Sequence, residues 1–156
     1  MHTRVDPMEA IIFTGIPGSG KSTFYKQNFF NSHLRINLDM LRTRRRESIL
    51  LHACLQAGQR FVVDNTNVTA DERAQYIGFA REARFQVTGY IFESNMGDCI
   101  RRNSERMGKA RVPDSAIAAM SRRLQIPSYA EGYSTLYYVK IVETGGFEVV
   151  ELRNDV

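Results

Sequence analysis

Residues 15–22 of the chain read GIPGSGKS, a spacing of glycines, lysine and serine that fits a phosphate-binding loop. Glycines let the backbone bend so that successive N–H groups face one anion, and a helix N-terminus behind the loop adds partial positive charge. The glycines of the motif are Gly15, Gly18 and Gly20. Lys21 would reach the β and γ phosphates of a nucleotide, and the Ser22 hydroxyl would ligate Mg²⁺. The motif therefore predicts a site for a nucleoside triphosphate and its magnesium ion.

The nucleotide is expected to be ATP, because the sequence contains no N-K-x-D motif, the guanine selector of GTPases. Further residues of the loop and of the helix after it belong to the same predicted binding site: Pro17, Ser19 and Thr23. Thr23 also stands where that helix begins. A phosphate loop by itself predicts only that phosphate is bound, so transfer, hydrolysis and switching remain open at this point.

A second group of polar residues, RINLDMLRTRRR at positions 35–46, sets one aspartate among five arginines. Transfer of a phosphoryl group to an alcohol needs a base near the hydroxyl and cations near the phosphoryl group. Asp39 follows a short predicted strand at the same edge of the sheet as the phosphate loop, and it is the candidate base. Arg42 would share a helix face with Asp39 and hold a neighbouring phosphate. Asp39 could instead, or in addition, cap the helix N-terminus.

Asp64 ends the apolar run FVVD, where a carboxylate at the tip of a buried strand would face the phosphate loop. The turn-forming residues Asn65, Thr66 and Asn67 follow it. In one interpretation Asp64, with Ser22, binds Mg²⁺ through water, or it positions the acceptor together with Asn65 and Asn67. In the other, these residues form an Asx turn that leads into the next helix without any ligand.

A second basic segment, IRRNSERMGKARVP at positions 100–113, lies in a predicted helical lid over about residues 95–124. Arg102 and Arg106 would stand one turn apart on a common helix face, followed by a glycine-containing loop. Positive side chains on such a segment suit a lid that closes over the phosphates of ATP. The competing interpretation is a solvated amphipathic helix with an Arg101–Glu105 pair.

The elements that must position these residues follow from the pattern of apolar and polar positions. Strands are expected at 10–14, 33–37, 61–64 and 85–92, and helices at 21–29, at 39–57, after the Thr69 capping box, at 94–107 with Ser94 as the cap, and from Pro113 onward. Two last segments, 136–143 and 147–153, flank Thr144-Gly145-Gly146 and predict a β-hairpin. This alternation indicates an α/β fold with a mainly parallel sheet and helices on both faces.

Length and composition place these elements in one domain over residues 1–156, with 43% hydrophobic residues, enough for a proper core. The net charge is +4, and segments 35–46 and 101–111 each carry +4 against a mildly acidic remainder, which favours anionic ligands at two places. No apolar run is long enough to span a membrane, and the start MHTRVDPMEA lacks the apolar stretch of a signal peptide, so a cytoplasmic protein is expected. Cys54 and Cys99 are expected to be reduced packing residues.

Five motifs together resemble the kinase domain of the polynucleotide 5′-hydroxyl kinases, and the resemblance covers nearly the whole chain: GIPGSGKSTF, NLDMLR, VVDNTN, RRNSERMGKARVP and AEGY. It implies a three-layer P-loop NTPase and kinase fold, with ATP and Mg²⁺ as cofactors and a nucleic acid 5′ end as partner. It implies that Asp39 is the general base for the attacking 5′-hydroxyl and that Arg42 binds the acceptor's 3′-phosphate. It also implies that Arg106, with Arg102, contacts the donor phosphates from the lid.

The sequence departs from that family in two respects. The phosphatase and adaptor domains that often accompany this kinase are absent from the 156 residues, and no aromatic-rich basic groove for extended single strands is evident. Small-molecule P-loop kinases and kinase-like toxins that phosphorylate sugar nucleotides share much of the motif set. Two alternatives therefore stay open: a kinase for a nucleoside, sugar or sugar nucleotide, and an ATP-binding module without catalysis.

Overall fold

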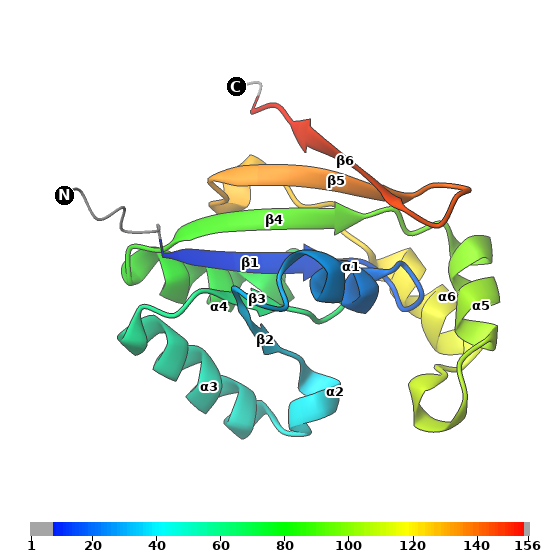
Figure 1. Ribbon diagram of the computed structural model, residues 1–156, viewed down its shortest axis with the longest axis horizontal. Helices are drawn as coiled ribbons and strands as arrows, with labels where there is room; N and C mark the ends of the chain where they lie inside the picture. The colour runs from blue at the N-terminus through cyan, green and yellow to red at the C-terminus, as the bar shows by residue number, and fades with distance from the viewer. Residues whose placement is uncertain (1–7, 155–156) are drawn as a thin grey trace.

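The computed structural model describes residues 8–154, and its centre is a six-stranded sheet with the strand order β2-β3-β1-β4-β5-β6 (Figure 1). Five strands are parallel, and the last strand runs antiparallel to β5. Their bounds are β1 (Glu9–Thr14), β2 (Leu34–Ile36), β3 (Phe61–Val63), β4 (Gln86–Phe92), β5 (Thr135–Ile141) and β6 (Phe147–Leu152). The predicted mainly parallel sheet and its closing hairpin β5–β6 are confirmed.

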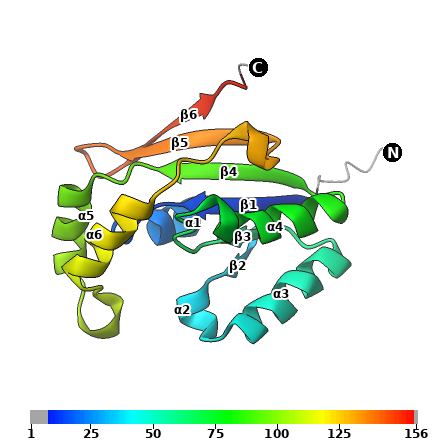
Figure 2. The same ribbon diagram turned by 180° about the vertical axis from the view of Figure 1, so that it is seen from behind.

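Helices cover both faces of this sheet. On one face lies α1 (Lys21–Asn28), in front of β1 in Figure 1. On the other lie α3 (Arg44–Ala57) and α4 (Ala70–Glu82), which come to the front in Figure 2. At the end of the sheet stand α5 (Met96–Ser104) and α6 (Asp114–Arg123), and the short helices are α2 (Leu38–Leu41), η1 (Gly108–Ala110) and η2 (Tyr129–Glu131). This is the predicted three-layer α/β arrangement.

The central strand β1 is apolar on both sides because both of its faces are covered. Ala10 and Ile12 pack with α3 and α4, whereas Ile11 and Phe13 pack with α1. On the α1 side the core is rich in aromatic rings, with centroid separations from 4.9 to 6.2 Å around Phe13. These contacts fix α1, the helix whose N-terminus begins at the phosphate loop.

A third, smaller apolar cluster joins α5 and α6, the helices of the predicted lid, to the phosphate loop. Ile16 of the loop packs there with Val68, with Cys99 of α5 and with Ile117 of α6. Cys99 and Cys54 are both buried, free cysteines, as predicted. No helix within residues 8–154 is both long and apolar enough to cross a membrane.

The predicted helix over residues 39–57 is wrong as one element, because the chain forms two helices there. Arg42 ends α2 with a φ of 77°, a left-handed conformation that interrupts the helix. Thr43 then starts α3, and its side chain accepts a hydrogen bond from the Arg46 N–H. A threonine cap outweighs the apolar periodicity here because it satisfies a backbone donor that α3 leaves free.

The helix predicted over residues 94–107 also begins and ends differently in the structure, where α5 spans Met96–Ser104. Asn95, not Ser94, caps α5, since its side chain accepts from the Asp98 N–H at 3.0 Å. The Ser94 hydroxyl instead accepts a hydrogen bond from the Ile16 N–H of the phosphate loop. The helix ends at Ser104, because the buried Asn103 side chain binds both backbone groups of Val112 and closes the following loop.

At the opposite end of the sheet, Glu9 makes a hydrogen bond with His33 that should contribute to stability in acid. The hydrogen bond from His33, 2.8 Å from Glu9 Oε1, holds the pKa of the Glu9 carboxyl below its ordinary value. Such a group stabilises the fold above its unfolded pKa, and this stability is lost as the pH falls through the folded value. We expect Glu9→Gln to lower the melting temperature at pH 7 and to flatten its fall between about pH 5 and pH 3. Exposed Glu143→Gln is the control, and an equally steep fall in Glu9→Gln would contradict the expectation.

Candidate active site

The phosphate loop between β1 and α1 takes a conformation that requires glycine at two positions. Gly18 has a φ of 84° and Gly20 a φ of 97°, both in the left-handed region that side chains disfavour. A Cβ on Gly18 would also collide with the Cys99 carbonyl oxygen of α5. The close approach of the lid helix to the loop therefore depends on the missing side chain.

Lys21 lies folded into its own loop. Its Nζ donates to the Gly15 carbonyl at 2.8 Å and to the Ile16 carbonyl at 3.1 Å, and it is 3.5 Å from Ser19 Oγ. Burial lowers the pKa of Lys21 to about 8; the Asp64 carboxylate opposes this shift. The ammonium is thus held beside the loop with little surrounding water, which strengthens its attraction to a phosphate.

Ser22 and Asp64 are brought together from residues that are far apart in the sequence. The Ser22 hydroxyl donates to Asp64 Oδ2 at 3.1 Å, and the Asp64 side chain is almost fully buried. A hydroxyl and a carboxylate are a donor set that fits Mg²⁺, which takes oxygen ligands and commonly one or two carboxylates plus phosphates. Among residues 8–154 no group of three or more His, Cys, Asp or Glu side chains could hold a metal. Phosphate oxygens and water would have to complete the coordination.

Arg35 contacts the same two side chains, and the sequence had not singled it out. Its Nε donates to Asp64 Oδ2 at 2.8 Å, and its Nη2 donates to Ser22 Oγ at 2.9 Å. Strand alternation could have given the signal: Ile36 points into the core on the α3 side, so its neighbour in β2 must face α1 and the phosphate loop.

Asp39 lies in the first turn of α2, exposed, and lines the same cavity as the phosphate loop. The capping role that was open for Asp39 belongs to Asn37, whose Oδ1 accepts from the Met40 N–H at 2.9 Å. The Asn37 Nδ2 also donates to the Asp64 carbonyl at 2.7 Å, which ties α2 to the end of β3. The Asp39 carboxylate is not used as the helix cap.

Arg42 also lines this cavity, but it reaches the cavity by a different geometry from the predicted one. It is the residue that ends α2, so it does not continue a helix face shared with Asp39. Its positive φ is uncommon for a residue with a side chain and carries backbone strain. Strained positions of this kind cluster at functional sites.

Asn65 connects α2 to a buried carboxylate. Its Oδ1 accepts from the Leu38 N–H at 2.9 Å, and its Nδ2 donates to Glu47 Oε2 at 3.0 Å. Glu47 is 3% exposed and also accepts from the Tyr76 hydroxyl at 2.7 Å. Burial and this hydrogen bond raise the pKa of Tyr76 to about 12, so the phenol stays a donor. The helix that carries Asp39 is therefore positioned through Asn65 by Glu47.

Asn67 supports the phosphate loop from behind. Its Nδ2 donates to the Phe13 carbonyl at 2.8 Å, and its own φ is 47°. One residue earlier, the Thr66 carbonyl accepts from the Gly15 N–H at 3.0 Å. Both asparagines of the turn line the cavity while their amides make these internal bonds.

We expect Glu47→Gln to lower turnover by about 10- to 100-fold with little change in ATP affinity, because loss of alignment alone costs this much. In one orientation the new amide would face the Asn65 amide as donor against donor, and in the other it would face the Arg44 guanidinium in the same way. Rotation of Asn65 to relieve this conflict would remove the acceptor of the Leu38 N–H. Turnover and ATP affinity are measured separately, with exposed Glu82→Gln as the control.

Tyr76→Phe tests the same connection, since it removes a donor to Glu47 but leaves Asn65 in place. A loss of turnover that merely tracks the melting temperature in both variants would reduce Glu47 to a structural role.

A cavity of about 980 Å³ brings most of the predicted site residues together: Pro17, Gly18, Gly20, Lys21, Ser22, Thr23, Asp39, Arg42, Asp64, Asn65, Asn67 and Arg106. Three predicted residues do not line it: Gly15, Ser19 and Arg102. The sequence did not single out several other residues that line the cavity, among them Arg44, Glu72, Gln75 and Tyr76. The phosphate loop and the segment from Asp39 to Arg42 thus contribute to one cavity.

The two lid arginines have different surroundings. Arg102 Nη1 donates to the Gly18 carbonyl at 2.9 Å, so it fastens α5 to the phosphate loop. Arg106 is exposed and lies past the end of α5, so it is not on a helix face shared with Arg102. Arg106 lines the main cavity and, as a cation, lowers the pKa of Lys21 beyond the effect of burial. The Arg101–Glu105 pair is not formed; Arg101 lies 3.4 Å from Asp98 instead.

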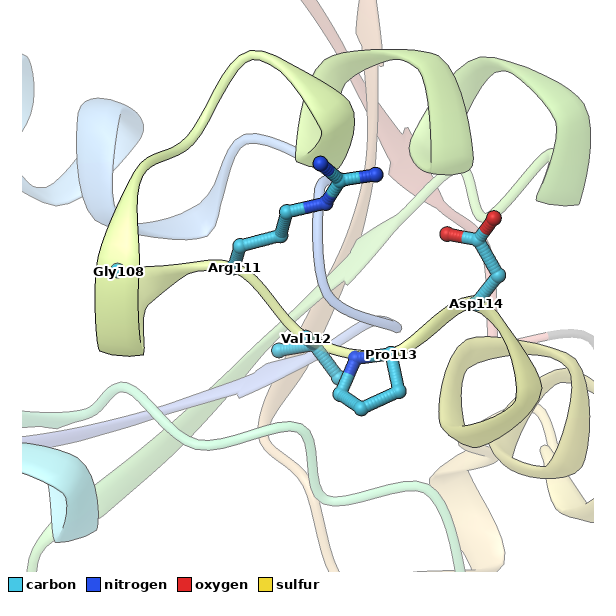
Figure 3. A pocket seen from close by; sticks show the side chains of 5 residues that line it. All are labelled: Gly108, Arg111, Val112, Pro113 and Asp114. Carbon is cyan, nitrogen blue, oxygen red and sulfur yellow. The ribbon is translucent and has the colours of Figure 1, made fainter.

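A smaller hollow of about 370 Å³ lies within the lid (Figure 3). Its lining is Gly108, Arg111, Val112, Pro113 and Asp114, and it shares only Val112 with the main cavity. With one arginine just after η1 and one aspartate at the start of α6, it offers no arrangement of catalytic groups.

The sequence also matches the profile of a known domain family. Residues 42–127, just over half of the chain, match the family described as an AAA domain. The chain belongs to this family. Its P-loop kinase fold places the phosphate loop and α2 of this AAA domain at the same edge of the sheet.

Two curated proteins are similar to this AAA domain. The bifunctional polynucleotide phosphatase/kinase of Schizosaccharomyces pombe is 26% identical over 132 residues, covering 82% of this chain and 32% of its own length. A protein of Acanthamoeba polyphaga mimivirus, provisionally given the same name, is 29% identical over 135 residues with the same two coverages. The chain spans about a third of the length of these relatives.

Among solved structures, Kti12 of Chaetomium thermophilum in complex with ADP-AlF3 has the same fold. Its TM-score is 0.67 at 18% identity, and the match covers 87% of this AAA domain and 92% of Kti12. At this level of identity the similarity establishes the fold alone.

Proposed function

We propose that this protein transfers the γ-phosphate of ATP to a hydroxyl group, the 5′-hydroxyl at an end of DNA or RNA. The observation that carries the proposal is the single cavity of about 980 Å³ that contains the phosphate loop together with Asp39 and Arg42. A module that only binds a nucleotide has no need for a carboxylate and an arginine in the same cavity as the phosphate loop.

The donor side is built from the phosphate loop. Its backbone and Lys21 would bind the β and γ phosphates, with Thr23 lining the same wall. Ser22 and Asp64 would hold Mg²⁺. When bound, that ion neutralises charge on the phosphates and orients them. Arg106 would contact the donor phosphates, while Arg102 would hold the lid helix on the loop.

On the acceptor side, Asp39 would accept the proton of the attacking hydroxyl, because it is a free carboxylate in the cavity and no longer needed as a cap. Arg42 would bind a phosphate next to that hydroxyl, and Arg44 lines the same cavity. Asn65 and Asn67 would position the acceptor indirectly, since they hold α2 and the phosphate loop.

A nucleic acid end is favoured as acceptor by two observations. The acceptor half of the cavity carries arginines, which suit a hydroxyl flanked by phosphate rather than a neutral sugar. The two curated relatives, matched over most of this chain, are named polynucleotide phosphatase/kinases.

The test is transfer of label from γ-labelled ATP in the presence of Mg²⁺. Oligonucleotides with a 5′-hydroxyl should become labelled, and the same oligonucleotides with a 5′-phosphate should not. Lys21→Met serves as the inactive control protein. Labelling of a nucleoside, sugar or sugar nucleotide in place of oligonucleotides would replace the proposed acceptor. ATP binding without transfer to any acceptor would refute the proposed activity.

A further inference from the structure

Arg35 is a cation placed between the two oxygens assigned to the metal. Its Nε lies 2.8 Å from Asp64 Oδ2 and its Nη2 lies 2.9 Å from Ser22 Oγ, so one guanidinium bridges both side chains. The Arg35 side chain is 25% exposed, and Asp64 is 1% exposed. A fork of donors fixed in this way is a strong, charge-assisted contact.

A metal ion and this guanidinium compete for the same groups. Asp64 Oδ2 accepts hydrogen bonds from both Arg35 and Ser22. Ser22 Oγ accepts one from Arg35, which occupies one of the two lone pairs of the hydroxyl oxygen. Mg²⁺ binds its oxygens at about 2.0–2.1 Å and tolerates little distortion of its coordination. Two positive groups on the same pair of oxygens would also repel each other.

The Arg35 side chain has a second partner that it can keep after it leaves these oxygens. Its Cζ lies 5.8 Å from the centroid of the Tyr25 ring of α1, within the range of a cation–π contact. Tyr25 itself is held by a hydrogen bond from its hydroxyl to the His33 carbonyl at 2.7 Å. The ring is therefore a fixed surface beside the metal site.

We propose that Arg35 is a built-in counter-ion of the metal site: it holds Ser22 and Asp64 together in the nucleotide-free protein and is displaced from them when the metal ion binds. The inference rests on the proposed function, which assigns these two residues to the metal. Arg35 then sets how tightly the ion is held, because each binding event must break its two hydrogen bonds.

The experiment measures metal affinity rather than activity. Mn²⁺ is titrated into the protein saturated with ADP, and free Mn²⁺ is followed by electron paramagnetic resonance. We expect Arg35→Gln to bind Mn²⁺ about tenfold more tightly than the unchanged protein. This gain corresponds to about one charge-assisted hydrogen bond that metal binding no longer has to break. Arg35→Lys should give a smaller gain, since an ammonium is a point charge without the planar fork.

Arg44→Gln is the matched control, because Arg44 lines the same cavity but bonds Glu47 and Tyr76 instead of the metal pair. It removes one positive charge and should leave Mn²⁺ affinity within about twofold of the unchanged protein, because distant charges that are screened by solvent interact only weakly. An affinity in Arg35→Gln that is unchanged, weaker or equal to that of Arg44→Gln would overturn the proposal. If Arg35→Gln fails to fold, the Mn²⁺ affinity of Arg35→Lys tests the proposal by the same comparison.

Asp64→Asn separates this proposal from the proposed function. Loss of Mn²⁺ binding in Asp64→Asn, with no gain in Arg35→Gln, refutes only the role of Arg35. Undiminished Mn²⁺ binding in Asp64→Asn would show that the metal site was wrongly assigned, and the proposal for Arg35 would fail with it. The proposed transfer activity would still be decided by the labelling assay.

Discussion

Asp39→Asn is expected to lower turnover by about 10²–10⁴-fold while ATP binding is retained, the range typical of a lost general base. The substitution keeps the shape of the side chain, and α2 keeps its cap, because Asn37 and not Asp39 makes that bond. The amide cannot accept a proton from an alcohol at neutral pH. A large loss of rate would therefore report chemistry and not a disturbed helix.

The measurement pairs a steady-state transfer assay with ATP titration of the same preparation. Asp71→Asn, an exposed aspartate in the first turn of α4, is the matched control and should leave both quantities near normal. A nearly normal rate in Asp39→Asn would remove this residue from the catalytic assignment.

Lys21→Met should weaken ATP binding by about 10²-fold or more, because charge-assisted bonds to phosphate each contribute on the order of 1.5–3 kcal/mol. In the nucleotide-free protein the Lys21 ammonium donates to carbonyls of its own loop, which the triphosphate would replace with stronger acceptors. The apolar methionine leaves the buried volume filled, so the fold should persist. Titration calorimetry with ATP gives the dissociation constants.

The same lysine should couple ATP binding to proton uptake. Burial lowers the pKa of Lys21 to about 8, so near pH 8 a sizeable fraction of the protein carries a neutral amine. The triphosphate favours the charged form and raises this pKa, so binding takes up protons near pH 8 but not at pH 6.5. The uptake is obtained by calorimetry in buffers of different ionisation enthalpy. Persistence of the uptake in Lys21→Arg, whose charge does not titrate in this range, would assign it to another group.

The fold was largely predictable because its signals are local. Apolar runs such as residues 10–14 do not alternate with polar residues, which is the pattern expected of a parallel strand buried on both faces. The strands of the structure lie close to the predicted ones. The hairpin at the end was readable from Gly145, which takes a φ of 87° in the turn. The predictions failed at element ends, at Arg42 and at Ser104, where a side-chain cap or a distant carbonyl outweighs periodicity.

The sequence by itself determined which residues could bind a triphosphate, since a phosphate loop is a short motif whose backbone geometry depends on glycines only a few positions apart. It also supplied Asp39 and Arg42 as candidates for the acceptor side. Neither inference required knowledge of distant contacts, because strand ends and helix starts place such residues at one edge of a parallel sheet.

Only the tertiary structure decided what those residues touch. Arg35 reaches Asp64, which is 29 positions away, and Arg102 reaches the Gly18 carbonyl across 84 positions. Such contacts depend on how strands are ordered in the sheet and how helices pack on it, and no local pattern of residue types encodes a partner that far along the chain. The folded structure therefore places the unassigned Arg35 beside Ser22 and Asp64, the proposed metal ligands. It also shows that Arg102, a predicted phosphate ligand, connects α5 to the phosphate loop.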